Sequence, residues 1–319
     1  MKKILMMLLA AAIVGAGVTP TDVEAATKKK SATAKKKAPR VAMQIKGKRM
    51  ARAKSAHRIA SLDDAQHLAL QSSAALVLDQ TTGAVLFEKN PSAILPIASI
   101  TKLMTAMVVL DAKPDLTETL AISEQDVDIL KGTRSRLKVG TQLAREEMLR
   151  LALMSSENRA AAALSRNYPG GREAFISAMN QKAQALGLVD TRFQDPTGLT
   201  AANVSSPRDL AKMVDAAHQY PLIREFSTTS EGEFSIAGRP QQFRNTNTLV
   251  KNPSWEIGLS KTGYINEAGK CLVMQAWLNN KPTIIVLLDS WGKMTRIGDA
   301  NRIKRWVESA SLAQRQSAG

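Results

Sequence analysis

The stretch 96-PIASITKLMTAMVVLD-111 combines a helix start with two reactive side chains. Pro96 and small residues precede an apolar run with helical spacing, so the sequence predicts a helix over about 99–112. Ser99 and Lys102 are three residues apart, and residues with this spacing share one face of a helix. The amino end of a helix also offers free N–H groups that stabilise an oxyanion. The stretch therefore has two interpretations, a serine nucleophile with a lysine base, or a helix start with a solvated lysine nearby.

The Ser-x-x-Lys pattern also occurs at Ser135/Lys138 and at Ser290/Lys293, so context must decide between the three matches. Ser135 lies in KGTRSRLKVG, which predicts an exposed loop, and a glycine separates Ser290 from its lysine. Only Ser99 stands at the start of a strongly apolar helix. A lysine must be neutral to act as a base, and burial or a second cation nearby lowers its pKa.

A second motif can supply that cation. Lys261-Thr262-Gly263 is the only Lys-Thr-Gly sequence in the chain, and it lies at the end of a predicted strand. A strand edge can present backbone groups to an extended substrate, and glycine permits a close approach. The alternative is an ordinary strand end at the surface.

A third motif, Ser-x-Asn, has two candidates. Ser156 and Asn158 interrupt the apolar run 150-RLALMSSENRAAAAL-164, within a helical pattern over 145–165. Ser165 and Asn167 precede Tyr-Pro-Gly-Gly, which explains them as a helix end. Because buried polar groups need partners, the interruption at Ser156 and Asn158 points to a site.

The remaining pattern predicts the fold. Short β-rich runs surround the turn QTTG, and three more lie close together near the carboxyl end. We expect an α/β protein, an α+β sandwich whose five-stranded antiparallel sheet is built from both ends of the chain and is flanked by helices, with an all-helical subdomain from the middle. The expected strands are 74–79, 84–89, 255–264, 271–278 and 283–289, and further helices are expected at 171–186 and 295–312.

The amino-terminal region differs from the rest in composition. Residues 1–25 have a basic start, an apolar core and a small-x-Ala site, which predicts a signal peptide cleaved after Ala25 or Ala26; an uncleaved anchor is the alternative. Residues 26–58 hold 13 Lys and Arg and no acidic residue, which predicts a disordered linker. The catalytic domain is expected over 59–312, followed by a tail, 313–319.

The net charge of +16 is concentrated in that linker. The remainder, 59–319, has 29 basic and 26 acidic residues, which argues against a nucleic-acid-binding fold. The linker is either a spacer or an electrostatic contact with anionic lipids or wall polymers. Cys271 is the only cysteine, so no internal disulfide is possible. No His-Glu-x-x-His motif is present, and no metal or cofactor is expected.

The order Ser-x-x-Lys, Ser-x-Asn, Lys-Thr-Gly resembles the penicillin-recognising serine enzymes, which are D,D-peptidases and β-lactamases. The stretches 96–111, 193–211 and 245–276 resemble the low-molecular-mass penicillin-binding proteins in particular. Within them the resemblance is closest to the D-alanyl-D-alanine endopeptidase branch, the penicillin-binding protein 7 type. It extends over about residues 60–310.

The resemblance implies a role for each motif. Ser99 would attack a D-alanine carbonyl of a peptidoglycan stem peptide and form an acyl-enzyme, with Lys102 as general base and Ser156 as proton relay to the leaving amine. Substrate would be bound by residues of the other motifs. These are Asn158, Lys261, Thr262, Gly263 and Tyr264. Asn158 would also position Lys102, and Lys261 would also lower the pKa of Lys102. The backbone N–H of Tyr264 would form the oxyanion hole with that of Ser99.

Four functions remain open from the sequence. An endopeptidase of the periplasm, inhibited by β-lactams, is favoured because little chain follows the Lys-Thr-Gly motif, whereas many carboxypeptidases of this kind continue into a second domain. A D-alanyl-D-alanine carboxypeptidase is the alternative. A class A β-lactamase is disfavoured, since no Glu-x-x-Leu-Asn lies between Ser156 and Lys261. A catalytically silent penicillin-binding wall protein is the last.

Overall fold

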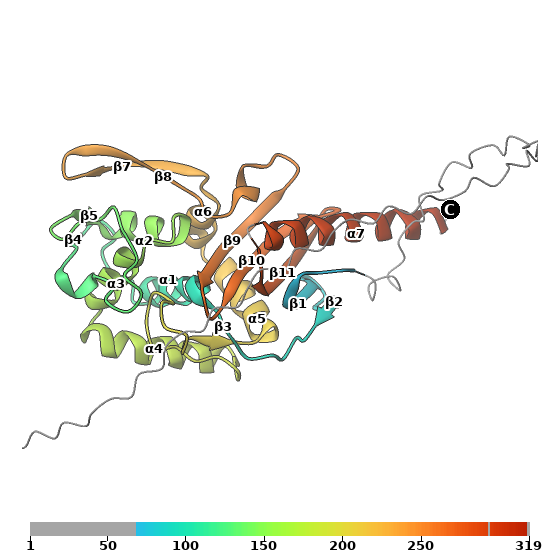
Figure 1. Cartoon of the computed structure of the whole chain (residues 1–319), viewed down its shortest axis with the longest axis horizontal. Coiled ribbons are helices and arrows are strands. Elements are labelled where there is room, and N and C mark those ends of the chain that lie inside the picture. The colour runs from blue at the N-terminus through green and yellow to red at the C-terminus, as the bar shows by residue number, and fades with distance from the viewer. Residues whose placement is uncertain (1–67, 293, 318–319) are drawn as a thin grey trace, which may run out of the picture. The chain divides into compact units, whose positions relative to one another are not determined.

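The computed structural model describes residues 68–292 and 294–317 (Figure 1). The expected signal peptide and basic linker lie outside the described residues. Within the described part, no helix combines the length and the apolar character needed to cross a membrane.

The centre of the fold is a five-stranded antiparallel sheet in the order β2-β1-β11-β10-β9. This confirms the sheet predicted from the two ends of the sequence, since β1 pairs with β11. The pairing joins residues more than 200 positions apart, such as Ser72 and Ser290. The strands are β1 Ser72–Asp79, β2 Val85–Lys89, β9 Glu256–Ile265, β10 Gly269–Leu278 and β11 Lys281–Ser290.

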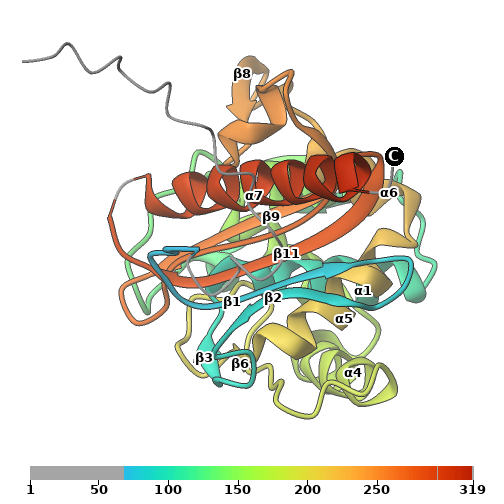
Figure 2. The same ribbon diagram turned by 90° about the vertical axis from the view of Figure 1, so that its right-hand side faces the viewer.

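The sheet is buried on both faces, as its alternating side chains show. Ala74 and Leu76 of β1 point into one hydrophobic cluster, and Ala75 and Val77 into the other. Helix α7 (Thr295–Ser317) covers the second face, and α5 (Pro207–His218) lies on the first (Figure 2). Helix α7 begins where the sequence predicts and continues to Ser317.

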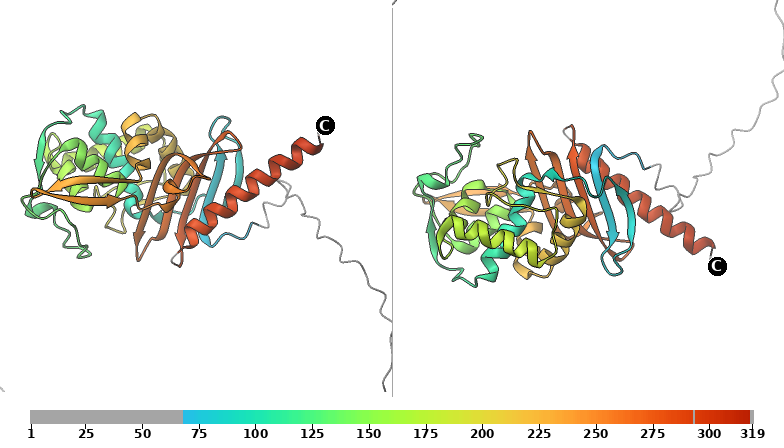
Figure 3. Two further views of the ribbon diagram at one scale, coloured as in Figure 1. Left: turned by 90° about the horizontal axis from the view of Figure 1, so that it is seen from above. Right: turned by 90° about the horizontal axis from the view of Figure 1, so that it is seen from below.

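The helical part lies beside the sheet, on the side away from α7 (Figure 3). Helix α1 (Thr101–Asp111) runs through its centre and is buried over almost its whole length. It follows a 3-10 turn, Ala98–Ile100, that carries Ser99. The other helices of this part are α2 Arg145–Met154, α3 Asn158–Arg166, α4 Gly171–Ala185 and α6 Pro221–Thr228.

The single helix expected over 145–165 is wrong, because the chain breaks there into α2 and α3. Ser156 has φ 61°, the left-handed region, and an L-residue in that conformation cannot continue a right-handed helix. The polar interruption seen in the sequence is therefore a turn between two helices.

Residues 187–254 hold elements that the sequence analysis did not assign. They include α5, α6 and a hairpin that stands over the helical part (Figure 1). The hairpin strands are β7 Glu231–Ile236 and β8 Arg239–Arg244, and the short pairs elsewhere are β3 Leu95–Pro96 with β6 Val204–Ser205 and β4 Thr119–Ala121 with β5 Gln142–Ala144.

Candidate active site

Ser99 lies in the 3-10 turn that leads into α1, and two glycines let the chain pack tightly around this turn. Ala98 has φ 47°, so the turn is in the left-handed region just before Ser99. A Cβ on Gly263 would lie 2.8 Å from the Ile97 carbonyl oxygen and 3.2 Å from the Ser99 nitrogen. A Cβ on Gly198 would lie 1.9 Å from the Ala98 carbonyl oxygen. Strand β9 and the loop before β6 therefore fix the position of the turn from two sides.

Lys102 is fully buried one helical turn further on, and its ammonium group has three acceptors. Lys102 Nζ donates to Ser99 Oγ at 2.8 Å, to Asn158 Oδ1 at 2.8 Å and to the Thr197 carbonyl oxygen at 2.6 Å. The acceptors come from three separate segments of the chain. Ser99 and Lys102 are thus brought together as the sequence predicts, with the lysine nitrogen in hydrogen-bonding reach of the hydroxyl.

Burial lowers the pKa of Lys102 from 10.5 to about 7. The negative charges of Asp195 and Glu157 act in the opposite direction and raise it. A pKa near 7 leaves a substantial neutral fraction at neutral pH, which is the form that accepts a proton.

Ser156 and Asn158 approach the lysines from the turn between α2 and α3. Lys261 Nζ donates to Ser156 Oγ at 3.0 Å, and Asn158 Nδ2 donates to Thr133 Oγ1 at 3.2 Å. The Asn158 amide is therefore fixed from both ends, by Lys102 and by Thr133. The left-handed backbone of Ser156 separates α2 from α3 and so places the two side chains at the site.

Lys261 is also buried, within β9 and two residues before Gly263, which packs against the turn of Ser99. Its pKa lies well below its ordinary value because of burial and because the charges of Lys102 and Arg296 repel its own. Thr262 Oγ1 donates to Thr246 Oγ1 at 2.6 Å. Arg296 of α7 donates to the Gly263 carbonyl oxygen at 3.1 Å and so supports the strand from behind.

Tyr264, the residue after the Lys-Thr-Gly motif, contributes to the site differently. Its side chain is exposed, its hydroxyl donates to Asn266 Oδ1 at 2.9 Å, and Lys270 Nζ lies over its ring. The predicted role concerns its backbone N–H, which follows Gly263 on the strand next to Ser99. That role stays a prediction.

The sequence analysis missed the segment that supplies the third acceptor of Lys102. Asp195, in the stretch Asp-Pro-Thr-Gly, accepts from the backbone nitrogens of Thr197 and Gly198, each at 2.5 Å, and of Thr200 at 2.9 Å. This turn holds the Thr197 carbonyl against Lys102. An aspartate before Pro-Thr-Gly is a turn signal, although it does not reveal which side chain the turn faces.

The competing motif matches lie elsewhere in the fold. Ser135 is in a loop and donates to Glu157 Oε2 at 2.7 Å, with no contact to a lysine. Ser165 is buried within α3 and donates to the Ala162 carbonyl oxygen. Lys293 lies outside the described residues. The choice of Ser99 and Ser156 over these alternatives is consistent with where the buried lysines lie.

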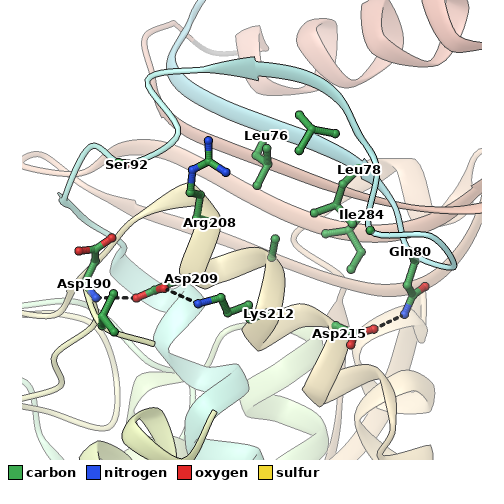
Figure 4. Close-up of a pocket in the computed structure, with 14 residues that line it drawn as sticks. Leu76, Leu78, Gln80, Ser92, Asp190, Arg208, Asp209, Lys212, Asp215 and Ile284 are labelled. Carbon is green, nitrogen blue, oxygen red and sulfur yellow. Dashed lines mark hydrogen bonds and ion pairs between the residues drawn. The ribbon is translucent and has the colours of Figure 1, made fainter. Parts of the chain in front are cut away.

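A separate cavity of about 520 Å³ lies between α5 and the sheet (Figure 4). Leu76, Leu78 and Ile284 form its apolar floor, while Arg208 and Lys212 line its polar side. None of the predicted catalytic residues lines it. Among the described residues, no group of three or more His, Cys, Asp and Glu gathers as a metal site.

Comparison with known sequences agrees with this geometry. The model of the S11 peptidase family, described as D-alanyl-D-alanine carboxypeptidase, matches residues 61–292. The chain belongs to the S11 peptidase family. This family member is a serine D,D-peptidase, and the recognition made from its three motifs is confirmed.

Its relatives include proteins named endopeptidase and a solved structure named transpeptidase. The D-alanyl-D-alanine endopeptidases of Pseudomonas aeruginosa and Escherichia coli are 52% and 50% identical to this S11 peptidase, each over 71% of the chain and 74% of the relative. The solved Streptomyces K15 DD-transpeptidase is 28% identical, with a TM-score of 0.70 over 75% of this chain and 97% of that one. The predicted fold class is confirmed by this likeness and by the five-stranded antiparallel sheet.

Proposed function

We propose that this S11 peptidase hydrolyses D-alanyl bonds of peptidoglycan stem peptides through an acyl-enzyme on Ser99. The observation that carries the proposal is the buried Lys102, whose nitrogen lies 2.8 Å from Ser99 Oγ and whose pKa is lowered to about 7. A serine hydroxyl needs an adjacent base to become a nucleophile, and this lysine is both placed and tuned to be one.

The first half of the reaction forms the ester. The Ser99 proton passes to Lys102 Nζ while Ser99 Oγ attacks the D-alanine carbonyl carbon. The resulting oxyanion is received by the backbone N–H groups of Ser99 and Tyr264. The bond to the leaving amine then breaks as Ser156 Oγ gives that amine a proton and receives in its place the proton that Lys102 Nζ had taken up.

The second half releases the acyl group. A water molecule gives a proton to Lys102 Nζ and attacks the ester carbonyl, and Lys102 passes that proton to Ser99 Oγ as this oxygen leaves. Asn158 holds Lys102 and binds the substrate amide, and Lys261 with Thr262 binds the carboxylate end of the substrate. Lys261 Nζ also donates to Ser156 Oγ at 3.0 Å, so the residue proposed to bind the carboxylate also orients the proposed proton relay.

We propose an endopeptidase that cleaves cross-links between D-alanine and diaminopimelate during wall remodelling. The Pseudomonas aeruginosa and Escherichia coli relatives, at 52% and 50% identity, are named endopeptidases, whereas the Bacillus subtilis relative, named a carboxypeptidase, is 34% identical. A carboxypeptidase that removes terminal D-alanine is the second candidate, supported by the family's description. Both activities belong outside the cytoplasm, in the periplasm, after cleavage of the proposed signal peptide.

Cross-linked muropeptide dimers test the proposal directly. The purified protein should convert dimers to monomers, seen by mass spectrometry, and Ser99→Ala should abolish the conversion. Release of free D-alanine from pentapeptides without dimer cleavage would establish the carboxypeptidase instead.

Fluorescent penicillin tests the acyl-enzyme itself. The wild type should be labelled on Ser99, Ser99→Ala should not be labelled, and Ser156→Ala should be labelled more slowly. Ser165→Ala is the matched control, since Ser165 belongs to the other Ser-x-Asn match and bonds only within α3. If penicillin does not label the wild type, the proposed acyl-enzyme on Ser99 is wrong.

A further inference from the structure

A small cavity adjoins the catalytic lysine on the side of Asn158 and Thr197. Its volume is about 100 Å³, which suits one side chain rather than a whole peptide. Its walls come from the loop 125–130, from α3 and from the Asp195 turn. Val127, Ile129, Leu130 and Leu199 make part of the lining apolar. A side chain held there would lie directly beside the groups that bind Lys102.

The acidic side chains that line the cavity are all engaged by neighbouring groups. Asp126 pairs with Arg166 at 2.9 Å, and Asp128 accepts from Thr133 Oγ1 at 2.7 Å and from three backbone nitrogens. Asp195 accepts from the turn that it caps. These carboxylates therefore have little capacity left for a ligand.

Arg172 is the basic residue of the cavity, and it is free to bind. It stands in the first turn of α4, its side chain is exposed, and no described residue forms a hydrogen bond or ion pair with it. An adjoining cavity of about 240 Å³ is also lined by Arg172, so the guanidinium can reach either space. An unpaired guanidinium next to an apolar wall matches an aliphatic chain that ends in a carboxylate.

The position of the cavity indicates which half of the substrate enters it. Neither Ser156 nor any residue of β9 lines it, whereas Asn158 and Thr197 do. In the proposed mechanism Ser156 protonates the leaving amine, so the leaving half lies toward Ser156 and Lys261. The cavity therefore faces the acyl half, the stem peptide that becomes attached to Ser99.

We propose that Arg172 binds a carboxylate of the acyl-donor stem peptide and thereby selects the donor. This inference rests on the proposed function and adds a specificity determinant to it. The carboxylate is either that of the diaminopimelate side chain or that of the glutamate in the same stem, and both have the chemistry that a guanidinium recognises.

Four synthetic dimers with one common acceptor stem separate these sources. Their donor stems carry diaminopimelate or lysine before D-alanine, each with the glutamate carboxyl free or amidated. The wild type should cleave the preferred donor with a kcat/KM about 10- to 100-fold above that of the donor lacking the bound carboxylate. Arg172→Met should remove this preference, and Arg172→Lys should keep part of it.

Two controls show that the loss is specific. Arg305→Met removes an exposed arginine of α7, on the far face of the sheet, and should leave the preference unchanged. Penicillin acylation of Arg172→Met should match the wild type, since the groups around Lys102 are untouched.

The outcomes distinguish this inference from the proposed function. Equal cleavage of all four dimers by the wild type, or a preference that survives in Arg172→Met, would overturn the role of Arg172. A wild type that is acylated by penicillin and cleaves no dimer would instead count against the endopeptidase. In that event the same donor stems, used as competitors of penicillin acylation, decide the role of Arg172 by binding alone.

Discussion

Lys102 and Lys261 both have buried ammonium groups, and each donates to the hydroxyl of a different serine, Ser99 at 2.8 Å and Ser156 at 3.0 Å. The two positive charges repel, and the charge of Lys102 contributes to the low pKa of Lys261. Because two such charges are costly to bury together, the site favours the loss of a proton near neutral pH. In the proposed mechanism, the pair would therefore link the attack by Ser99 to the protonation by Ser156.

The rate of penicillin acylation should rise with pH through the pKa of Lys102, about 7. A lysine base works only in its neutral form, so the rate falls as pH drops below that value and levels off above it. Rapid-mixing kinetics between pH 5.5 and 9 would measure the profile. A rate independent of pH across this range would contradict a lysine base in Lys102.

Glu157→Gln should move this profile to lower pH. The charge of Glu157 raises the pKa of Lys102, and the amide removes the charge while its oxygen can still accept from Ser135. Glu173→Gln, which neutralises an exposed carboxyl at the start of α4, is the control and should leave the midpoint unchanged. A midpoint that rises in Glu157→Gln would show that another group sets the profile.

Gly263→Ala should slow acylation by at least about 100-fold, as displacement of catalytic groups by an ångström does. The new Cβ would press on the Ile97 oxygen at 2.8 Å and on the Ser99 nitrogen at 3.2 Å, which forces β9 away from the nucleophile. The matched control is Gly298→Ala in α7, where a Cβ meets only Arg302, at 3.4 Å. A normal acylation rate in Gly263→Ala would show that the Ser99 turn accommodates the new Cβ, and that Gly263 does not fix its position.

Asp299→Asn should destabilise the fold by about 1–3 kcal/mol, the cost of leaving buried hydrogen-bonding groups unpaired. Asp299 is fully buried and accepts from the backbone nitrogens of Gln71 and Ser72 and from Ser72 Oγ, so it ties α7 to the start of β1. Urea unfolding would measure the loss, with penicillin acylation of the folded protein unchanged. Asp215→Asn, at an exposed contact with Gln80, should cost little.

The features of the fold and of the site that were predicted from the sequence are those that depend on residue type. Alternating apolar residues such as Ala74 and Leu76 specified the strands, and three short motifs in order specified the group of Ser99, Lys102, Ser156 and Lys261. The residue types can be recognised in the sequence, whereas the burial that lowers the pKa of Lys102 is a property of the fold.

The features that the sequence analysis missed depend on the conformation and the position of the backbone. Apolar residues lie on both sides of the polar interruption at Ser156, so the sequence analysis extended one helix where a left-handed residue separates two. The third acceptor of Lys102 is the carbonyl of Thr197, and every residue has a carbonyl. Only the three-dimensional position of the Asp195 turn distinguishes this carbonyl from the others.

The close packing at Gly198 and Gly263 also limits how this protein can evolve under antibiotic selection. Backbone atoms stand against the Ser99 turn on both sides, so a mutation that reshapes the turn to exclude a drug would also disable the peptidase. Ile129 and Leu130 are exposed and line the small cavity instead, where a change would act on the proposed donor site rather than on the turn. Variants that escape β-lactams and keep turnover should therefore leave the Ser99 turn unaltered.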